Sequence, residues 1–140
     1  MRKDLRPALA RGGTSVKFRT MKTVVVLGAS AKPDRYSFKA LKRLREHGYN
    51  ALPVNPGVPE ILGETCHPSI RDVAGPIDTV TMYLSEAHST PLIPDIIAAA
   101  PRRIVINPGA ENPQLANAAE AAGIGVVHGC TLVMLQAGTF

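Results

Sequence analysis

The residues best suited to chemistry lie in the segment 28–37, GASAKPDRYS, which follows a short apolar run. This segment offers the hydroxyls of Ser30 and Ser37 and the cations Lys32 and Arg35. Arginine grips a phosphate through two parallel hydrogen bonds, whereas lysine acts as a point charge. If a helix begins here, its first N–H groups and its dipole favour an anion by about 0.3–1 kcal/mol. The residue types are compatible with a phosphate site and equally with a hydrophilic surface turn.

The same segment matches a dinucleotide-binding fingerprint only in part. Of the pattern G-x-G-x-x-G it has Gly28, while Ser30 and Pro33 stand at the other two glycine positions. The next apolar run ends at Asn55, where an NAD site needs a carboxylate for the ribose. A small NAD(P)-dependent reductase is therefore kept only as an alternative.

Cysteine and histidine occur together at two places, Cys66-His67 and His128-x-Cys130. Neither pair has the C-x-x-C spacing typical of zinc sites, so we expect no metal. The Cys130 thiol is either reactive or a small buried side chain, and free cysteine usually packs. No P-loop, G-x-S-x-G motif or paired carboxylates occur, and we expect no catalytic residues.

The elements that must position these groups follow from apolar periodicity and from turn residues. Short β-branched or apolar runs predict strands, and apolar residues at helical spacing predict helices. Thr90 with Pro91, and Asn112 with Pro113, have the residue types of a helix cap and first turn. The predicted strands are 24–27, 51–54, 77–84, 104–106 and 125–128, and the predicted helices are 37–48, a short one near 69–73, 90–100 and 113–122.

This alternation predicts an α/β fold with a five-stranded, mainly parallel sheet and helices on both faces. Residues 58–75 are otherwise expected to be loop, and the apolar segment 131–135 is expected to pack on the sheet. In such folds ligands bind beyond the carboxyl ends of the strands, where the strand order reverses. The loops after Leu27, Val54, Leu84, Ile106 and His128 are therefore the candidate binding loops.

Charge is distributed unevenly along the 140 residues, which have a formal net charge of +5. The excess lies within residues 1–20, whereas acidic and basic residues balance from Met21 onward. We expect residues 1–20 to be a disordered basic leader and 21–140 to be one domain. A nucleic-acid-binding arm is an alternative for the leader, although we do not expect a nucleic-acid partner. The lack of a long apolar stretch and the two distant cysteines predict a cytoplasmic protein without a membrane span.

Three segments in register resemble the stand-alone CoA-binding protein family. They are residues 28–37, the triplet Val54-Asn55-Pro56, and residues 60–63 (EILG). The domain of that family is similar to the N-terminal domain of the succinyl-CoA synthetase alpha subunit. The similarity extends from Thr23 nearly to the C-terminus.

The resemblance implies a Rossmann-like, three-layer domain that binds CoA as its ligand. It implies three groups of contacts: the first loop and helix start around the phosphates, the end of the second strand near the nucleotide, and residues after the third strand along the cleft. The residues in these groups are Gly28, Ala29, Ser30, Lys32, Arg35, Tyr36 and Ser37; Val54, Asn55 and Pro56; and Tyr83 and Leu84.

One position departs from the family pattern. Many members carry a lysine directly after Asn-Pro, whereas this chain has Gly57. We expect a protein that binds CoA or an acyl-CoA and is non-catalytic on its own. A subunit of a larger acyl-CoA synthetase is a further alternative, and the sequence leaves homodimer formation open.

Overall fold

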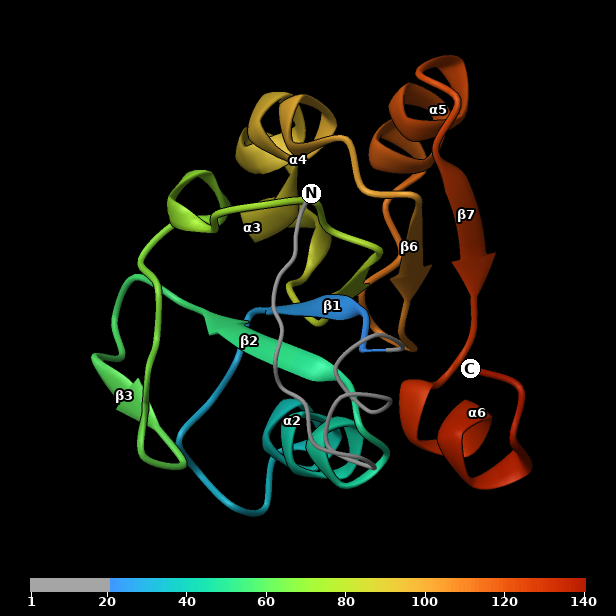
Figure 1. Cartoon of the computed structure of the whole chain (residues 1–140). Helices are drawn as coiled ribbons and strands as arrows, with labels where there is room; N and C mark the ends of the chain where they lie inside the picture. Colours follow the sequence, from blue (N-terminus) through green and yellow to red (C-terminus); the bar gives the residue numbers. More distant parts are fainter. Residues whose placement is uncertain (1–20) are drawn as a thin grey trace, which may run out of the picture.

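A central parallel sheet organises the molecule, as a computed structural model shows for residues 21–140; the predicted leader at 1–20 lies outside the described residues. The spatial order is β2-β1-β5-β6-β7, and every adjacent pair is parallel (Figure 1). The five-stranded α/β fold predicted from the sequence is thus confirmed. The strands are β1 (Thr23–Leu27), β2 (Asn50–Val54), β5 (Thr79–Met82), β6 (Arg103–Ile106) and β7 (Gly125–His128).

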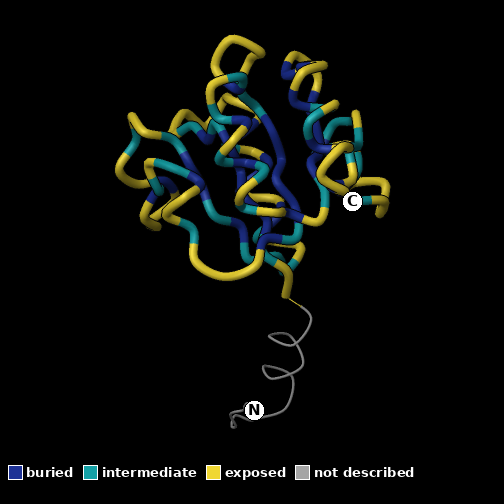
Figure 2. Tube along the Cα trace, turned by 90° about the horizontal axis from the view of Figure 1, so that it is seen from above, coloured by how far each residue is buried: buried dark blue, intermediate teal, exposed yellow. Residues whose placement is uncertain are grey.

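The middle of the sheet is buried on both faces. Val24, Val25 and Val26 of β1 are each 0 % exposed, as is Val80 of β5. A run of β-branched residues without polar alternation suits a parallel strand covered on both faces. In Figure 2 the buried segments run through the centre of the molecule, and the exposed segments lie at its margins.

Helices complete a three-layer arrangement on the two faces of the sheet. On one face α2 (Tyr36–Glu46) and α6 (Thr131–Ala137) cover β1, with Leu41 of α2 and Leu135 of α6 in one core cluster. On the other face α4 (Ile93–Ala99) and α5 (Pro113–Ala121) bury Ile96 and Leu115 in a second cluster. The Rossmann-like three-layer prediction is confirmed.

Helix α5 begins as its sequence predicts. The Asn112 side chain accepts hydrogen bonds from the N–H groups of Gln114 and Leu115, at 3.1 and 3.2 Å. Pro113 occupies the first helical position, where a missing N–H loses no bond. Asn112 also donates to the Ser89 hydroxyl at 2.8 Å, which ties the start of α5 to the preceding helical segment.

The prediction of a helix starting at Thr90 is wrong at its beginning. Helical structure starts earlier, with α3 (Glu86–Ser89), and continues through the 3-10 turn η2 (Thr90–Leu92) into α4. Ser85 takes the extended N-cap conformation. The Thr90 hydroxyl lies inside the helical run and donates to the Glu86 carbonyl at 2.8 Å, so it is not a cap. The predicted strand 77–84 is correspondingly shorter, at Thr79–Met82.

Residues 58–75 contain a hairpin that the sequence did not indicate. Strands β3 (Glu60–Ile61) and β4 (Glu64–Thr65) pair antiparallel around Leu62 and Gly63, both with positive φ. Such a turn is usually indicated by Asn-Gly or Asp-Gly, whereas the Leu62-Gly63 pair here gives no such signal in the sequence. The short helix predicted near 69–73 is present as the 3-10 turn η1 (Ile70–Asp72), capped by Ser69.

A buried polar cluster fixes α6 against the sheet. Asn107, which follows β6, donates from Nδ2 to Thr81 Oγ1 at 2.8 Å and to the Met82 carbonyl at 2.9 Å. Its Oδ1 accepts from the Thr131 backbone N–H at 2.8 Å, and the Thr81 and Thr131 hydroxyls bond each other. The predicted packing of the segment 131–135 on the sheet is confirmed, as part of a helix. Within residues 21–140, no helix is long and apolar enough to cross a bilayer.

Candidate functional site

The candidate site is a cleft at the carboxyl ends of β1, β5 and β6. From β1 the chain proceeds to β2 on one side, while β5 pairs on the other side, so the strand order reverses between β1 and β5. Loops that leave these two strands diverge and open a crevice. The crevice has a volume of about 520 Å³.

Gly28 lets the first loop pass close to the loop after β5. Its φ is +91°, and a Cβ there would lie 3.0 Å from the Leu84 side chain and 3.2 Å from the Leu84 backbone nitrogen. A side chain at this position would therefore meet both an unfavourable backbone conformation and a packed neighbour. The N–H groups of Gly28 and Ala29 both donate to the Val54 carbonyl, at 3.0 and 3.2 Å.

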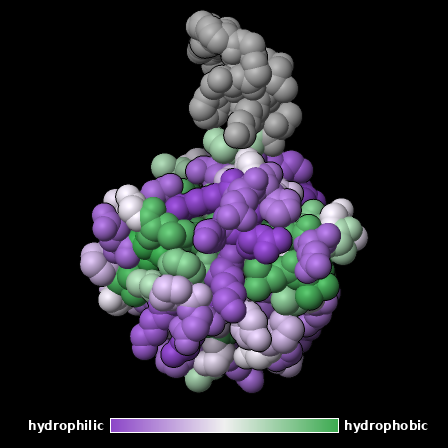
Figure 3. Space-filling model, turned by 90° about the horizontal axis from the view of Figure 1, so that it is seen from below, coloured by the Kyte–Doolittle hydropathy of each residue, from purple (hydrophilic) through white to green (hydrophobic). Residues whose placement is uncertain are grey.

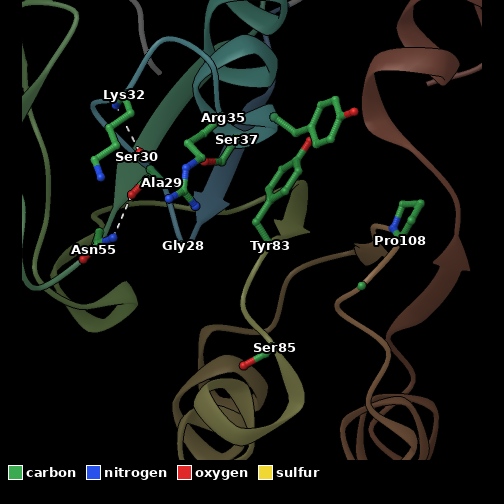
Figure 4. A pocket seen from close by; sticks show the side chains of 12 residues that line it. Gly28, Ala29, Ser30, Lys32, Arg35, Ser37, Asn55, Tyr83, Ser85 and Pro108 are labelled. Carbon is green, nitrogen blue, oxygen red and sulfur yellow. Dashed lines mark hydrogen bonds between the residues drawn. The ribbon is translucent and has the colours of Figure 1, made fainter.

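Asn55 holds the first loop to the end of β2. Its Nδ2 donates to the Ala29 carbonyl at 2.7 Å (Figure 4). Its Oδ1 accepts from the Gly57 N–H at 2.9 Å. The backbone N–H of Asn55 donates to His67 at 2.9 Å. The side chain predicted to lie near a nucleotide thus also serves as a cross-link between two loops.

The wall formed by the first loop and the start of α2 is electropositive. Arg35 is the N-cap residue of α2, and no side chain caps this 11-residue helix. Within residues 21–140 neither Lys32 nor Arg35 forms an ion pair with a carboxylate. Both side chains lie on the same wall in Figure 4, with Ser30 and Ser37 beside them. First-turn N–H groups, two cations and two hydroxyls together can hold a phosphate.

The opposite wall is formed by the loops after β5 and β6 and includes Tyr83, Ser85, Pro108 and Gly109 (Figure 4). The Tyr83 hydroxyl is shielded from solvent and meets no hydrogen-bond partner in the described residues. Burial raises the pKa of Tyr83 to about 12, and the nearby Thr131 hydroxyl offsets part of the rise without reaching hydrogen-bond geometry. The phenol is therefore neutral near pH 7.

Gly109 is already engaged by a carboxylate. Its N–H donates to both Glu111 carboxylate oxygens, at 3.0 and 3.1 Å. Backbone N–H groups, those of Glu111 itself first and of Gly109 second, hold the pKa of Glu111 below its usual range. A negative group thus lies beside this wall, and the positive groups for an anion are on the wall of α2.

A smaller cavity adjoins the cleft, because Gly28 and Asn55 line both. Its volume is about 100 Å³, and most of its lining side chains are apolar. The lining includes Val54, Pro56 and Leu84 from the predicted residues, and Ile70 and Leu92 from segments not predicted to contribute.

All the predicted site residues therefore lie around two joined cavities. The main cleft brings together Gly28, Ala29, Ser30, Lys32, Arg35, Tyr36, Ser37, Asn55 and Tyr83, and the smaller cavity adds Val54, Pro56 and Leu84. Sequence reasoning had singled out the loops after Leu84 and Ile106 but not their residues Ser85, Pro108 and Gly109. Among the predicted binding loops, the one after His128 contributes no residue to either cavity.

The two cysteines have different settings. Cys66 is buried beside the end of β2, and burial raises the pKa of its thiol. Cys130 is half-buried at the start of α6. In the part of the chain that the structure describes, no three His, Cys, Asp or Glu side chains gather in a way that could hold a metal ion.

Fold and cleft together define a class: an α/β protein with a crevice at its topological switch point, one wall of which carries Lys32 and Arg35. Residues 22–136 match the family described as the CoA binding domain, and the chain belongs to that family. The resemblance noted in the sequence is thereby confirmed.

The matches to two relatives cover part of the chain. The uncharacterized protein YneT of Bacillus subtilis is 39% identical over 62 residues, which is 44% of this chain and 46% of YneT. The ADP-forming acetate–CoA ligase of Methanocaldococcus jannaschii is 33% identical over 63 residues, 45% of this chain. The match spans only 9% of that ligase.

Solved structures confirm the fold. An uncharacterized protein at 40% identity superposes with a TM-score of 0.82 and covers 86% of this chain and 99% of its own. A Thermus thermophilus protein at 30% identity gives a TM-score of 0.78, covering 91% of this chain and 96% of its own. A dinucleotide-forming acetyl-coenzyme A synthetase of Ca. Korarchaeum cryptofilum, at 23% identity and a TM-score of 0.67, shares the fold over 77% of this chain and 25% of its own.

Proposed function

We propose that the protein binds CoA or an acyl-CoA, with the phosphates held at the first loop and the start of α2. The main observation behind this proposal is the uncapped start of α2, which lines the cleft beside Lys32 and Arg35. Membership of the CoA binding domain family supplies the ligand class. Arg35 reaches a phosphate oxygen with two N–H groups, while the first-turn N–H groups of α2 bind the same charge.

The smaller cavity suits the base of the same ligand. Its apolar lining and its position beside Gly28 and Asn55 favour a flat ring joined to phosphates in the main cleft. We assign the adenine to this cavity. The pantetheine arm then follows the main cleft toward Tyr83 and Pro108. We further propose that the protein on its own binds the thioester or thiol without reacting with it.

Calorimetric titration with CoA tests the assignment. Arg35→Ala is expected to weaken binding by about 1.5–3 kcal/mol, the range for a hydrogen bond to a charged group. Lys42→Ala is the matched control, because Lys42 is a cation of the same helix that lines a different groove. We expect this control to retain the wild-type affinity. Equal losses in both variants would indicate general charge attraction and not a site at Arg35.

Parallel thermal-shift measurements separate the proposal from the reductase alternative. Only a ligand that binds the native state raises the melting temperature. We expect CoA to raise it, NADPH to leave it unchanged and pantetheine, which lacks the nucleotide phosphates, to raise it less than CoA. A shift with NADPH and none with CoA would contradict the proposed function. A subunit role in a larger synthetase is supported by the similarity to the Methanocaldococcus ligase and predicts co-purification with further synthetase subunits.

A further inference from the structure

Strand β7 forms an open edge of the sheet. It is the last strand in the spatial order, and among residues 21–140 it pairs only with β6. Gly125 donates to the Arg102 carbonyl and Gly129 to the Ile106 carbonyl. Because alternate residues of a parallel strand bond to the same neighbour, Val126 and His128 direct their N–H and C=O groups outward. Such a row of groups is a template for pairing with another strand.

The opposite edge, β2, is closed within the described residues. Ala51 and Pro53 are its outward residues, since Asn50 donates to the Lys22 carbonyl on the β1 side. The Ala51 carbonyl accepts from the Arg45 side chain at 3.3 Å, and the Pro53 carbonyl accepts from the His67 N–H at 3.0 Å. Proline also has no N–H to offer. One edge of this sheet is thus protected against pairing, and the other is not.

The elements that form the β7 edge carry few of the charges that commonly protect an edge, although Arg103 of β6 lies opposite Gly125. Glu120 is the only Asp, Glu, Lys or Arg among residues 112–140, which include α5, β7 and α6. Figure 1 shows β7 at the right-hand margin of the molecule, with α5 above it and α6 below. On α6 the Val133 side chain is 62% exposed. In the view of Figure 3, a hydrophilic band runs over the middle and hydrophobic surface lies on both sides of it, including the right, the side of α6.

We propose that this β7 edge, flanked by α5 and α6, is the interface with a second copy of the chain. A two-fold axis at the edge sets the two β7 strands antiparallel and joins the sheets of both copies into one. In a two-fold interface the same surface is used on both copies, so a surface of a single charge sign repels its copy, whereas a surface with few charges is compatible with it. The low charge of α5, β7 and α6 therefore favours a second copy over a charged partner. Neither of the two cavities of the candidate site has a lining residue in β7.

Sedimentation equilibrium of the full chain tests this interface. Across about 1–200 µM, we expect wild type to approach the mass of two chains as concentration rises. His128→Pro removes one outward N–H, and Val133→Lys places like charges on both copies. Each variant is expected to raise the dissociation constant more than about tenfold. Leu62→Lys is the matched control, because Leu62 is also an exposed apolar residue but lies in the β3–β4 turn.

The outcomes decide the proposal. Unchanged far-ultraviolet circular dichroism establishes that the variants are folded, and Val133→Lys keeps the test valid if His128→Pro does not fold. Loss of the two-chain species in the folded β7-edge variants, with its retention in Leu62→Lys, supports the interface. A single-chain mass for wild type at every concentration overturns it, as does a folded Val133→Lys variant that associates as tightly as wild type. Neither result bears on CoA binding, because the cleft lies elsewhere.

Discussion

Replacing Gly28 with alanine tests whether the close approach of the first loop to Leu84 shapes the cleft. The φ of +91° disfavours any residue with a Cβ by about 1–2 kcal/mol. The added methyl also meets the Leu84 side chain at 3.0 Å, and overpacking of this kind typically destabilises by about 1–3 kcal/mol. Alanine also lowers the conformational entropy of the unfolded chain relative to glycine, which offsets about 0.4–1 kcal/mol of this destabilisation. We therefore expect Gly28→Ala to lower the free energy of unfolding by about 1–4.5 kcal/mol, centred at about 3 kcal/mol.

Urea denaturation measures this change, and Gly123→Ala is the matched control. Gly123 also has a positive φ, +79°, but its Cβ would meet nothing within 4 Å, so only the backbone effect remains. We expect the control to lose about 1 kcal/mol or less. The combination with Leu84→Ala should recover part of the loss at Gly28, because two of the close contacts are with the Leu84 side chain. Equal losses at Gly28 and Gly123, with no recovery in the double variant, would refute the close-approach argument.

Three further perturbations test other parts of the structure. Gly57→Lys is expected to tighten CoA binding by about 0.5–1 kcal/mol in calorimetry, because the new cation can reach a phosphate. The site has room for the side chain, since a Cβ at position 57 meets only the Asn55 Oδ1, at 3.7 Å. Weaker CoA binding by the variant would contradict this prediction. Asn107→Ala removes three buried hydrogen bonds and is expected to lower the unfolding free energy by about 3 kcal/mol in urea, while a loss below about 1 kcal/mol would mean that the cluster is dispensable. A hydrogen bond from Arg102 holds the pKa of Asp78 below its usual value, so the ionised carboxylate stabilises the folded state. This contribution to the free energy of unfolding is lost as the pH falls below about 4 and passes through the lowered pKa. Asp78→Asn should therefore flatten the acid limb of a stability-versus-pH curve, and an unchanged limb would exclude this contribution.

Much of the sheet was predictable because local signals and tertiary packing agree. The run Val24–Val26 is too apolar and too β-branched for a surface element, and it lies at the centre of the sheet. Asn112-Pro113 marks a helix start through bonds made within a few residues. Where local signals were weak or ambiguous, prediction failed: Leu62 occupies a tight turn that usually takes Asn or Gly, and Thr90 has a cap residue's chemistry but lies inside a helical run.

The candidate site divides in the same way. Gly28, Lys32 and Arg35 lie within one short segment, so their spacing along the chain already placed them together. Ser85 and Pro108 come from two other loops, and only the reversal of strand order between β1 and β5 brings those loops opposite the first. Their residue types are ordinary turn residues, which no local pattern distinguishes from other turns.

The amino-acid sequence alone determined the strand and helix alternation, the electropositive first loop and the family resemblance, because each follows from the types and order of residues close along the chain. Tertiary structure decided which loops face each other, how Gly28 approaches Leu84, and that Asn107 joins Thr81 to Thr131. It also decided that β2 is closed by Arg45 and His67 while β7 stays open. These features depend on contacts between residues distant in sequence, which exist only once the sheet order is set.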